Sequence, residues 1–560
     1  MTMPSGDHEV RDIEVPLRLQ PVVARPEGWR GRSINLIAVG LVGFVVIGVL
    51  LSTAFGNSGP SSPASGALAV ASGSPGPTAR PTRRPTPIPL PLATPLPTIE
   101  VHGTARPSER RLVYVDGPDL LDLGSGTLRS LGRTYEDVLW PVGSEYVCIC
   151  VVRSQGVGSS AAVTLQFGRF DETGERLAET DLVAYDDVVA VPEMTEGFSG
   201  FNIAATMDAA GDHLFVVATA RRPPVWIVEL HIVDVDTGSL LDSAVIDSFP
   251  VDLDELRPSA SPRMGFDAPD GVYAWAFAVA ATPDGETVFV RVALLEVLAE
   301  AWTSRNLEWF VPIGNGAAGD PLPMPEDAQL APDRWCIGRP TFVDAERLVQ
   351  VCGQPPQPGD GFWSVRRLTT AGKSLGDLPL GAVGEDVSAA AAPLVDRERR
   401  AVYLWDAFRH LVGRVDIDTG SAQQGLVDDP VVRGGGSPSG PAWIGFEPGL
   451  VLSGDRTRLY ALGLEAGNGG ARRSTGIWVF DADTLEMLDH WEPRALLTSL
   501  AVSADGRFVY AAGAPGYDAD GHENQRWPAS LTVYDATSGE IAVLYGAIGE
   551  GQWLGFPSAF

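Results

Sequence analysis

The sequence predicts an all-β fold, a β-propeller of seven to eight four-stranded blades behind a single transmembrane helix and a disordered linker rich in Pro, Ser and Thr. Two repeated units and one long apolar segment lead to this prediction. The units recur every roughly 50 to 65 residues, which is the length of four short strands with their turns. Strands that recur in sets of four along a chain are typical of a propeller.

The first repeated unit is a polar turn followed by an apolar strand. Asp and Gly supply the turn, and the next residues are β-branched or aromatic, as strands prefer. Two weaker copies occupy 342–352 and 394–404. The clear copies are DAAGDHLFVVA (208–218), TPDGETVFVRV (282–292), LSGDRTRLYAL (452–462) and SADGRFVYAAG (503–513).

The second unit is a strand that ends in Asp, followed by a short turn and another strand. Two copies, at 233–242 and 415–424, contain Asp-Thr-Gly, the tripeptide that carries the catalytic carboxylate of aspartic proteases. An aspartic protease in which Asp236 and Asp418 share a proton is therefore one alternative. The tripeptide is missing from three further copies, FDETGERLAET, FDADTLEMLDH and YDATSGEIAVL. A turn that repeats with the blades explains all five copies, whereas the protease explains two.

The two units together resemble the repeats of bacterial extracytoplasmic, membrane-anchored β-propellers of the YVTN or tryptophan-aspartate-like type. The resemblance covers about residues 110–560 and rests on PDGETVFV or ADGRFVYA followed by VFDADT or VYDATSGE. It implies a propeller fold and leaves the function open, because propellers host many functions. Strands near residue 110 and the C-terminal GQWLGFPSAF are left over, and joining them would close the ring.

A charge-free apolar segment determines the predicted topology. Residues 34–55, INLIAVGLVGFVVIGVLLSTAF, would span roughly 33 Å as a helix, which is enough to cross a bilayer. Arg25, Arg30 and Arg32 precede the segment, and the next basic residue is Arg80. The positive-inside rule then places the N-terminus in the cytoplasm and the rest of the chain outside. A cleaved signal peptide is the alternative, although its apolar run would be unusually long.

Charge and composition divide the sequence into parts with different partners. The formal net charge is −30, and residues 101–560 carry about −32, because 65 acidic residues there face 33 basic ones. So acidic a domain repels phosphate backbones, which argues against a nucleic-acid partner. The linker has too few large apolar side chains to form a core. The predicted parts are a short cytoplasmic tail (1–33), a transmembrane helix (34–55), a disordered Pro-rich linker (56–105) and the β-propeller (106–560).

All four cysteines lie after the apolar segment. Cys336 and Cys352 flank a predicted turn at Asp344, so a hairpin would place them opposite each other, and we expect a disulfide between them. Cys148 and Cys150 alternate in YVCICVV and share one face of a strand, which leaves their state open. A zinc site built from these cysteines is the alternative, but the usual C-x-x-C spacing is missing.

Candidate ligand sites lie in or beside predicted insertions between the regular strands. Asp518, Asp520 and Glu523 would offer oxygen ligands to calcium, with Gly521 giving the bend, although a solvated loop explains the same residues. The sequence suggests no cofactor other than calcium. Five aromatic residues are candidates for a binding surface or for the core: Trp302, Trp309, Phe310, Trp363 and Trp527.

These observations favour a binding or scaffolding module that is tethered to the plasma membrane and faces outward. Its expected partner is a protein, peptide or glycan of the cell envelope, bound by loops or the central channel. A propeller-type hydrolase or lyase at the channel mouth is the second candidate function, and the aspartic protease is the third. The sequence contains no H-E-x-x-H motif and does not decide whether any catalysis occurs.

The topology predicts a simple cleavage pattern. Protease treatment of intact spheroplasts should release a fragment of about the size of residues 101–560, because the linker lies outside the membrane. An immunoblot against a C-terminal tag measures the fragment, and a cytoplasmic marker that stays intact is the control. Protection of the tagged region would contradict the topology.

Overall fold

The computed structural model describes most of the residues between 100 and 546, and this part of the chain contains no α-helix. Accordingly, it includes no helix of the length and apolar character needed to cross a membrane. The predicted cytoplasmic tail, the transmembrane helix (34–55), most of the linker and the C-terminal segment lie outside the described residues. The larger internal gaps are 103–111, 131–137, 190–199, 252–270, 354–362, 382–390, 428–448 and 514–529.

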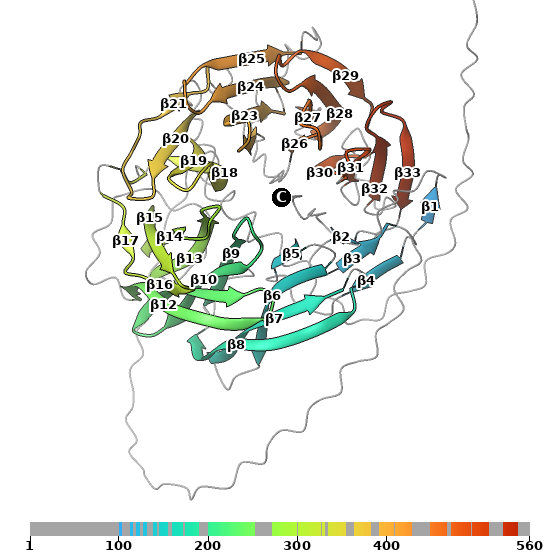
Figure 1. Cartoon of the computed structure of the whole chain (residues 1–560). Helices are drawn as coiled ribbons and strands as arrows, with labels where there is room; N and C mark the ends of the chain where they lie inside the picture. The colour runs from blue at the N-terminus through green and yellow to red at the C-terminus, as the bar shows by residue number, and fades with distance from the viewer. Residues whose placement is uncertain are drawn as a thin grey trace, which may run out of the picture.

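The described strands form eight antiparallel sheets that follow one another around a ring (Figure 1). The all-β prediction is confirmed, and eight is the larger of the two predicted numbers of blades. The first four sheets comprise β2 (Leu112–Val115), β3 (Asp119–Asp122) and β4 (Thr127–Ser130); β5 (Val138–Val142), β6 (Glu145–Ser154), β7 (Ser160–Phe170) and β8 (Arg176–Val189); β9 (Phe201–Met207), β10 (His213–Arg222), β11 (Val225–Asp234) and β12 (Ser239–Pro250); and β13 (Gly271–Ala281), β14 (Thr287–Leu298), β15 (Ala301–Gly314), β16 (Ala317–Ala318) and β17 (Leu322–Pro323).

The second half of the ring repeats the same arrangement. The last of these sheets gains a fifth strand, β1 (Glu100–His102), which pairs with its outer strand. The four sheets comprise β18 (Trp335–Phe342), β19 (Arg347–Gly353), β20 (Trp363–Thr369) and β21 (Leu378–Pro379); β22 (Ala391–Asp396), β23 (Ala401–Asp406), β24 (Leu411–Asp416) and β25 (Ala422–Leu426); β26 (Leu450–Leu452), β27 (Arg458–Ala466), β28 (Arg472–Asp481) and β29 (Met487–Trp491); and β30 (Leu497–Val502), β31 (Phe508–Gly513), β32 (Ser530–Asp535) and β33 (Ile541–Gly546).

Most sheets are meanders in which consecutive strands pair. In Figure 1 the first strand lies nearest the centre and the fourth on the outside, as β5 to β8 show. The second strand therefore has a neighbour on each edge and a sheet on each face, and β23 and β31 are buried along their whole length. This burial explains why the first repeated unit ends in an apolar run instead of an alternating pattern.

The hydrophobic core lies between neighbouring sheets, and polar tips of large side chains connect one sheet to the next. Trp226 of β11 donates its indole N–H to the carbonyl of Val272 at 2.6 Å. Trp405 of β23 donates in the same way to Leu462 of the following sheet at 2.5 Å. Each indole thus fills apolar space while its single donor is satisfied, as a buried Trp requires.

The ring closes where the first described sheet meets the last. Leu121 and Leu123 pack into a buried cluster with side chains of β31 to β33, among them Tyr510 and Tyr545. Tyr545 donates its hydroxyl to the carbonyl of Leu123 at 2.5 Å. Beside this contact, β1 extends the last sheet, so Glu100–His102 belong to the ring although the composition predicts a linker over residues 56–105.

The closing contact predicts a large effect from a small change. Leu121→Ala should lower the free energy of unfolding by about 2–5 kcal/mol, because Leu121 is fully buried and the ring cannot collapse onto the cavity. The control is Leu488→Ala, since Leu488 is 49% exposed and its loss should matter by less than about 0.5 kcal/mol. Denaturant titration of both variants measures the difference, and equal midpoints would contradict the contact.

Candidate functional site

The Asp-Thr-Gly segments are turns, and each turn is stabilised by the Asp that ends the preceding strand, two residues before the Asp of the tripeptide. The carboxylate of Asp416 accepts hydrogen bonds from the N–H groups of Asp418 and Thr419 and from the Thr419 hydroxyl, at 3.1, 2.7 and 2.8 Å. Asp481 forms the same three bonds in a copy without the tripeptide. These hydrogen bonds, led by the one from the Thr419 N–H, hold the pKa of the Asp416 carboxyl below its usual value. The repeated Asp is therefore a turn residue.

The residue after this Asp connects the turn to the preceding sheet. Ile417 and Ala536 are buried, and their carbonyls accept hydrogen bonds from Arg367 and Arg458 of the preceding sheets at 3.1 and 2.8 Å. Ala482 is buried in the same way and accepts from the Tyr403 hydroxyl at 3.0 Å. The second repeated unit is thus the device that fixes one sheet to the next.

The structure places the two predicted protease carboxylates in separate sheets. Asp236 follows β11 and Asp418 follows β24, and two other sheets lie between them along the ring (Figure 1). Asp418 pairs with Arg347 at 2.6 Å and with Arg400 at 2.5 Å. The two carboxylates cannot share a proton at this separation, so the geometry excludes the dyad that an aspartic protease needs.

A second hydrolase-like pattern also proves to be a turn. Gly372-Lys373-Ser374-Leu375-Gly376 matches G-x-S-x-G, whose serine stands between a strand and a helix in α/β-hydrolases. Here the segment joins β20 to β21, and the Ser374 hydroxyl accepts the N–H of Gly376 at 3.2 Å. Gly372 and Gly376 adopt φ values of 75° and 80°, which glycine tolerates. The serine therefore has a turn role.

Three of the predicted binding aromatics are core residues. Trp309 is 4% exposed and packs against Phe249, and Phe310 lies between Phe289 and Phe342. Trp363 is likewise buried, in the core between the sheet of β18 to β21 and the sheet of β22 to β25. The binding-surface hypothesis is wrong for these three, because aromatic residues fill the wedge between strands of adjacent sheets. Trp302 lies in β15, where it pairs with Val297, and Trp527 lies outside the described residues.

The predicted calcium ligands also fall outside the described residues. Asp518, Asp520 and Glu523 belong to the undescribed range 514–529. Among the described residues, no cluster of three or more His, Cys, Asp or Glu side chains could hold a metal ion.

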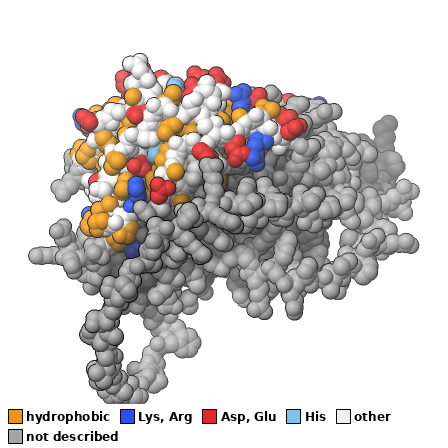
Figure 2. All heavy atoms as spheres, turned by 90° about the horizontal axis from the view of Figure 1, so that it is seen from below, with side chains coloured by type: hydrophobic (Ala, Val, Ile, Leu, Met, Phe, Trp, Pro, Cys, Tyr) orange, Lys and Arg blue, Asp and Glu red, His pale blue; other side chains and the backbone are white. Residues whose placement is uncertain are grey.

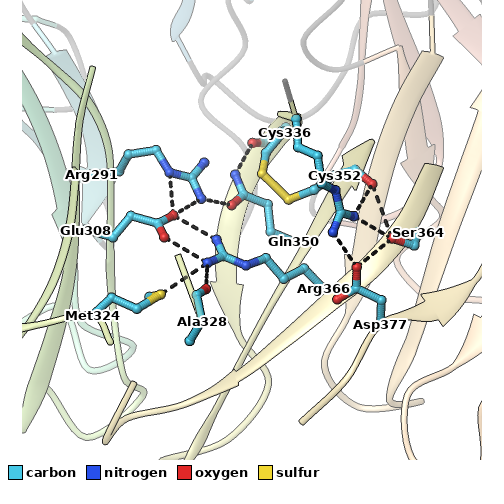
Figure 3. The surroundings of a disulfide bond; sticks show 12 residues. Arg291, Glu308, Met324, Ala328, Cys336, Gln350, Cys352, Ser364, Arg366 and Asp377 are labelled. Atoms are coloured by element: carbon cyan, nitrogen blue, oxygen red, sulfur yellow. Dashed lines mark hydrogen bonds and ion pairs between the residues drawn. A yellow bond between two sulfur atoms is a disulfide. The ribbon is translucent and has the colours of Figure 1, made fainter. Parts of the chain in front are cut away.

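Both cysteine pairs are bonded in the structure. Cys336 and Cys352 face each other across β18 and β19 and form a disulfide with a Cα–Cα distance of 3.9 Å (Figure 3). Cys148 and Cys150, whose state the sequence leaves open, form a second disulfide along β6. All four sulfur-bearing side chains are buried, so the described residues include no free thiol for zinc.

A buried charge cluster, which the sequence does not predict, connects two neighbouring sheets. Arg291 of β14 and Glu308 of β15 come from one sheet, and Arg366 of β20 and Gln350 of β19 come from the next (Figure 3). Glu308 accepts from Arg291 Nε at 2.8 Å and binds Arg366 through both carboxylate oxygens, each at 2.8 Å. Arg366 also donates to the carbonyl of Ala328. The cluster therefore forms a hydrogen-bonded polar contact between two sheets inside an otherwise apolar interface.

The electrostatics of this cluster are those of a desolvated ion group. The side chains of Arg291, Glu308 and Arg366 are only 1%, 0% and 5% exposed. Burial alone would raise the pKa of Glu308, but the two guanidiniums outweigh it and hold that pKa below its usual value. Glu308 is therefore ionised, and removing it would leave two buried guanidiniums without their shared partner. The sequence signal was a single Arg inside VFVRVA and two adjacent Arg inside SVRRLT, and periodicity alone does not show which charged residues meet.

A second polar array joins an exposed serine to a buried histidine and a buried tyrosine. The Tyr185 hydroxyl lies 2.6 Å from Nε2 of His231, and the Ser243 hydroxyl lies 2.8 Å from Nδ1 of the same ring. Burial lowers the pKa of His231 to about 4. A general base works best when its pKa lies near the working pH, so this imidazole is a poor activator for Ser243. The array satisfies a buried ring between two sheets instead.

The outer strand β12 presents an exposed edge. It ends the order β12-β11-β10-β9, and Leu241 and Val245 on it are 43% and 57% exposed. Asp242 accepts the N–H of Ala318 at 2.8 Å, which fixes the strand against the next sheet. Figure 2 shows the molecule from below, turned by 90° from the view of Figure 1. On the coloured part of that face, hydrophobic side chains lie among acidic and basic ones.

Comparisons with known proteins add little to this description. No family model matches the sequence, and no curated protein matches it. The dihydro-heme d1 dehydrogenase NirN in complex with DHE is 14% identical with a TM-score of 0.33, over 72% of this chain and 73% of that one. TolB from Acinetobacter baumannii is 11% identical with a TM-score of 0.27, over 73% of this chain and 81% of that one. The ring arrangement therefore rests on the strand pairing within this chain and not on these similarities.

The buried histidine predicts a pH-dependent stability. The unfolded chain protonates His231 below its ordinary pKa of 6.5, whereas the folded chain resists protonation down to a pKa of about 4. Stability from this site is complete above pH 6.5 and is lost as the pH falls towards 4, by up to about 3 kcal/mol. Denaturant titrations between pH 7 and pH 4.5 should show the loss, and His231→Gln should remove most of it.

Ser248→Ala is the matched control for this measurement, because Ser248 is exposed, lies in the same sheet and carries no titratable group. It should keep the pH dependence of the unchanged chain. An identical slope in the His231→Gln variant would show that other groups cause it.

Proposed function

We propose that this chain is an eight-bladed β-propeller, tethered to the plasma membrane by residues 34–55, that binds an extended segment of a protein or peptide in the cell envelope. The observation that carries the proposal is the exposed edge of β12. The sequence supports the tether and the outward-facing location, and the ring of sheets supports a rigid platform.

The backbone of β12 is suited to pairing with another strand. It is 12 residues long, and no described strand pairs with its outer side. Such an edge carries a row of N–H and C=O groups that can pair with an extended peptide. The chain already uses this mode once, since β1 adds to the outer strand β33 through Glu100, Val101 and His102.

The side chains along β12 favour a partner with apolar and basic residues. On the exposed face of β12, Leu241 and Val245 alternate with Ser239 and Ser243, and strand addition gains its specificity from alternate side chains of this kind. The acidic charge of residues 101–560, about −32, favours association with cationic segments over anionic ones. A glycan partner would lack the backbone groups that pair with a strand, so it uses the edge less well.

Binding fits the described residues better than catalysis. The repeated Asp residues and Ser374 stabilise turns, and the charge cluster at Glu308 and the array at His231 are buried between sheets. These groups serve the ring in the described part of the chain. A hydrolase or lyase would need its reacting groups elsewhere.

A peptide-binding experiment tests the proposed edge. The probe is a 12-residue peptide of alternating Val and Arg, and its backbone N-methylated form, which has lost donors for strand pairing, is the control probe. The double variant Leu241→Ser/Val245→Ser should bind the probe about tenfold or more weakly, because two apolar contacts are lost. Fluorescence anisotropy with the full-length chain in detergent measures the affinity.

The matched control variant is Met487→Ser/Leu488→Ser, which changes two residues of similar exposure on the five-residue outer strand β29. It should leave the affinity unchanged. Equal binding of the N-methylated probe, or a loss confined to the β29 variant, would contradict strand addition at β12.

A further inference from the structure

The buried cluster between the two sheets has an excess positive charge. Arg291 and Arg366 each carry one positive charge, and Glu308 is the single carboxylate among the described residues that bonds to them. The other partners, Gln350 and the Ala328 carbonyl, are neutral. Each cation bonds to the same anion, so one positive charge is left without compensation.

Protonation chemistry cannot remove this excess. Burial lowers the pKa of Arg291, and the Glu308 carboxylate opposes that shift, but a guanidinium does not give up its proton in proteins. An uncompensated charge in a desolvated interface is costly, whereas a counter-charge at hydrogen-bond distance offsets the cost. An anion beyond the described side chains would offset this cost.

One atom marks where that anion would lie. Arg291 uses Nε and Nη2 for Glu308 and Nη2 for Gln350, at 2.8, 2.5 and 2.6 Å. Its remaining terminal nitrogen, Nη1, is buried and makes no hydrogen bond in the part of the chain that the structure describes. Figure 3 shows this nitrogen pointing away from Glu308 and Gln350. A buried charged donor without an acceptor is the complement of an anion.

The surroundings favour a small, weakly hydrated anion. The ring of Phe289 lies 5.5 Å from Cζ of Arg291 and keeps water from that side of the guanidinium. On the other side, β18 leaves its regular pairing with β19 between Ile337 and Thr341, and Gly338 there accepts from Gln350 Nε2 at 3.3 Å. Full burial of Arg291 excludes a large or strongly hydrated ion.

We propose that a monovalent inorganic anion such as chloride binds beside Nη1 of Arg291 and completes the charge balance of the Arg291–Glu308–Arg366 cluster. The ion is part of the joint between the sheet of β13 to β17 and the sheet of β18 to β21. An ordered water at the same place would accept the hydrogen bond but would not neutralise the charge. With a bound halide the thermal stability depends on which anion is in solution, whereas with a bound water it does not.

Thermal unfolding in different sodium salts tests the proposal. The full-length chain is heated in sodium chloride, bromide or gluconate at equal ionic strength. Chloride and bromide should raise the Tm in a saturable manner, and gluconate should not, because it is too large for the site. Arg291→Gln removes the excess charge and should abolish the difference between the salts. Arg473→Gln, at an exposed arginine that pairs with Glu465, should keep it.

Crystals soaked in bromide give a readout that does not depend on the variant folding. An anomalous peak within about 3.5 Å of Arg291 Nη1 is expected, at a contact distance typical of an N–H group and a halide. A Tm that depends on ionic strength alone, or a map without that peak, would overturn the proposal.

Discussion

The buried contact between the first and last sheets is the interaction on which the rest of the ring depends. Each sheet has two apolar faces, and each face is covered only by a neighbour, so an open ring would expose the outer faces of its two end sheets. Leu121 and Leu123 cover one such face against β31 to β33, and the Tyr545 hydroxyl fixes their register through the Leu123 carbonyl.

Between the sheets, the same chemical device recurs in different forms. A turn that begins with Asp presents a buried carbonyl to the preceding sheet, as Ile417 does to Arg367. At one interface an ion cluster around Glu308 takes over this role. Replacing buried ions of this kind by well-packed apolar residues is often neutral or stabilising, so the cluster need not add to the stability of the ring. The Asp-Thr-Gly turns, which suggested a protease, are thus part of the contact between neighbouring sheets.

Much of the fold could be predicted from the sequence, because turns and strand ends are local. The copies at 208–218, 282–292, 452–462 and 503–513 each become a turn and a buried second strand, at β10, β14, β27 and β31. The sites were harder, because they depend on which side chains meet across sheets. Trp309, Phe310 and Trp363 looked like a binding surface, yet they fill the core. Arg291 and Arg366 lie 75 positions apart in the sequence, so no local pattern could pair them.

Hydrogen–deuterium exchange across the closing contact tests the ring most directly. The closed ring predicts that β2 to β4, at residues 112–130, exchange as slowly as β30 to β33 and that both speed up together in mild denaturant, as one cooperative unit. Mass spectrometry of peptides from the two segments measures this in the full-length chain. Exchange of residues 112–130 within seconds, while β30 to β33 stay protected, would contradict a closed ring of eight sheets.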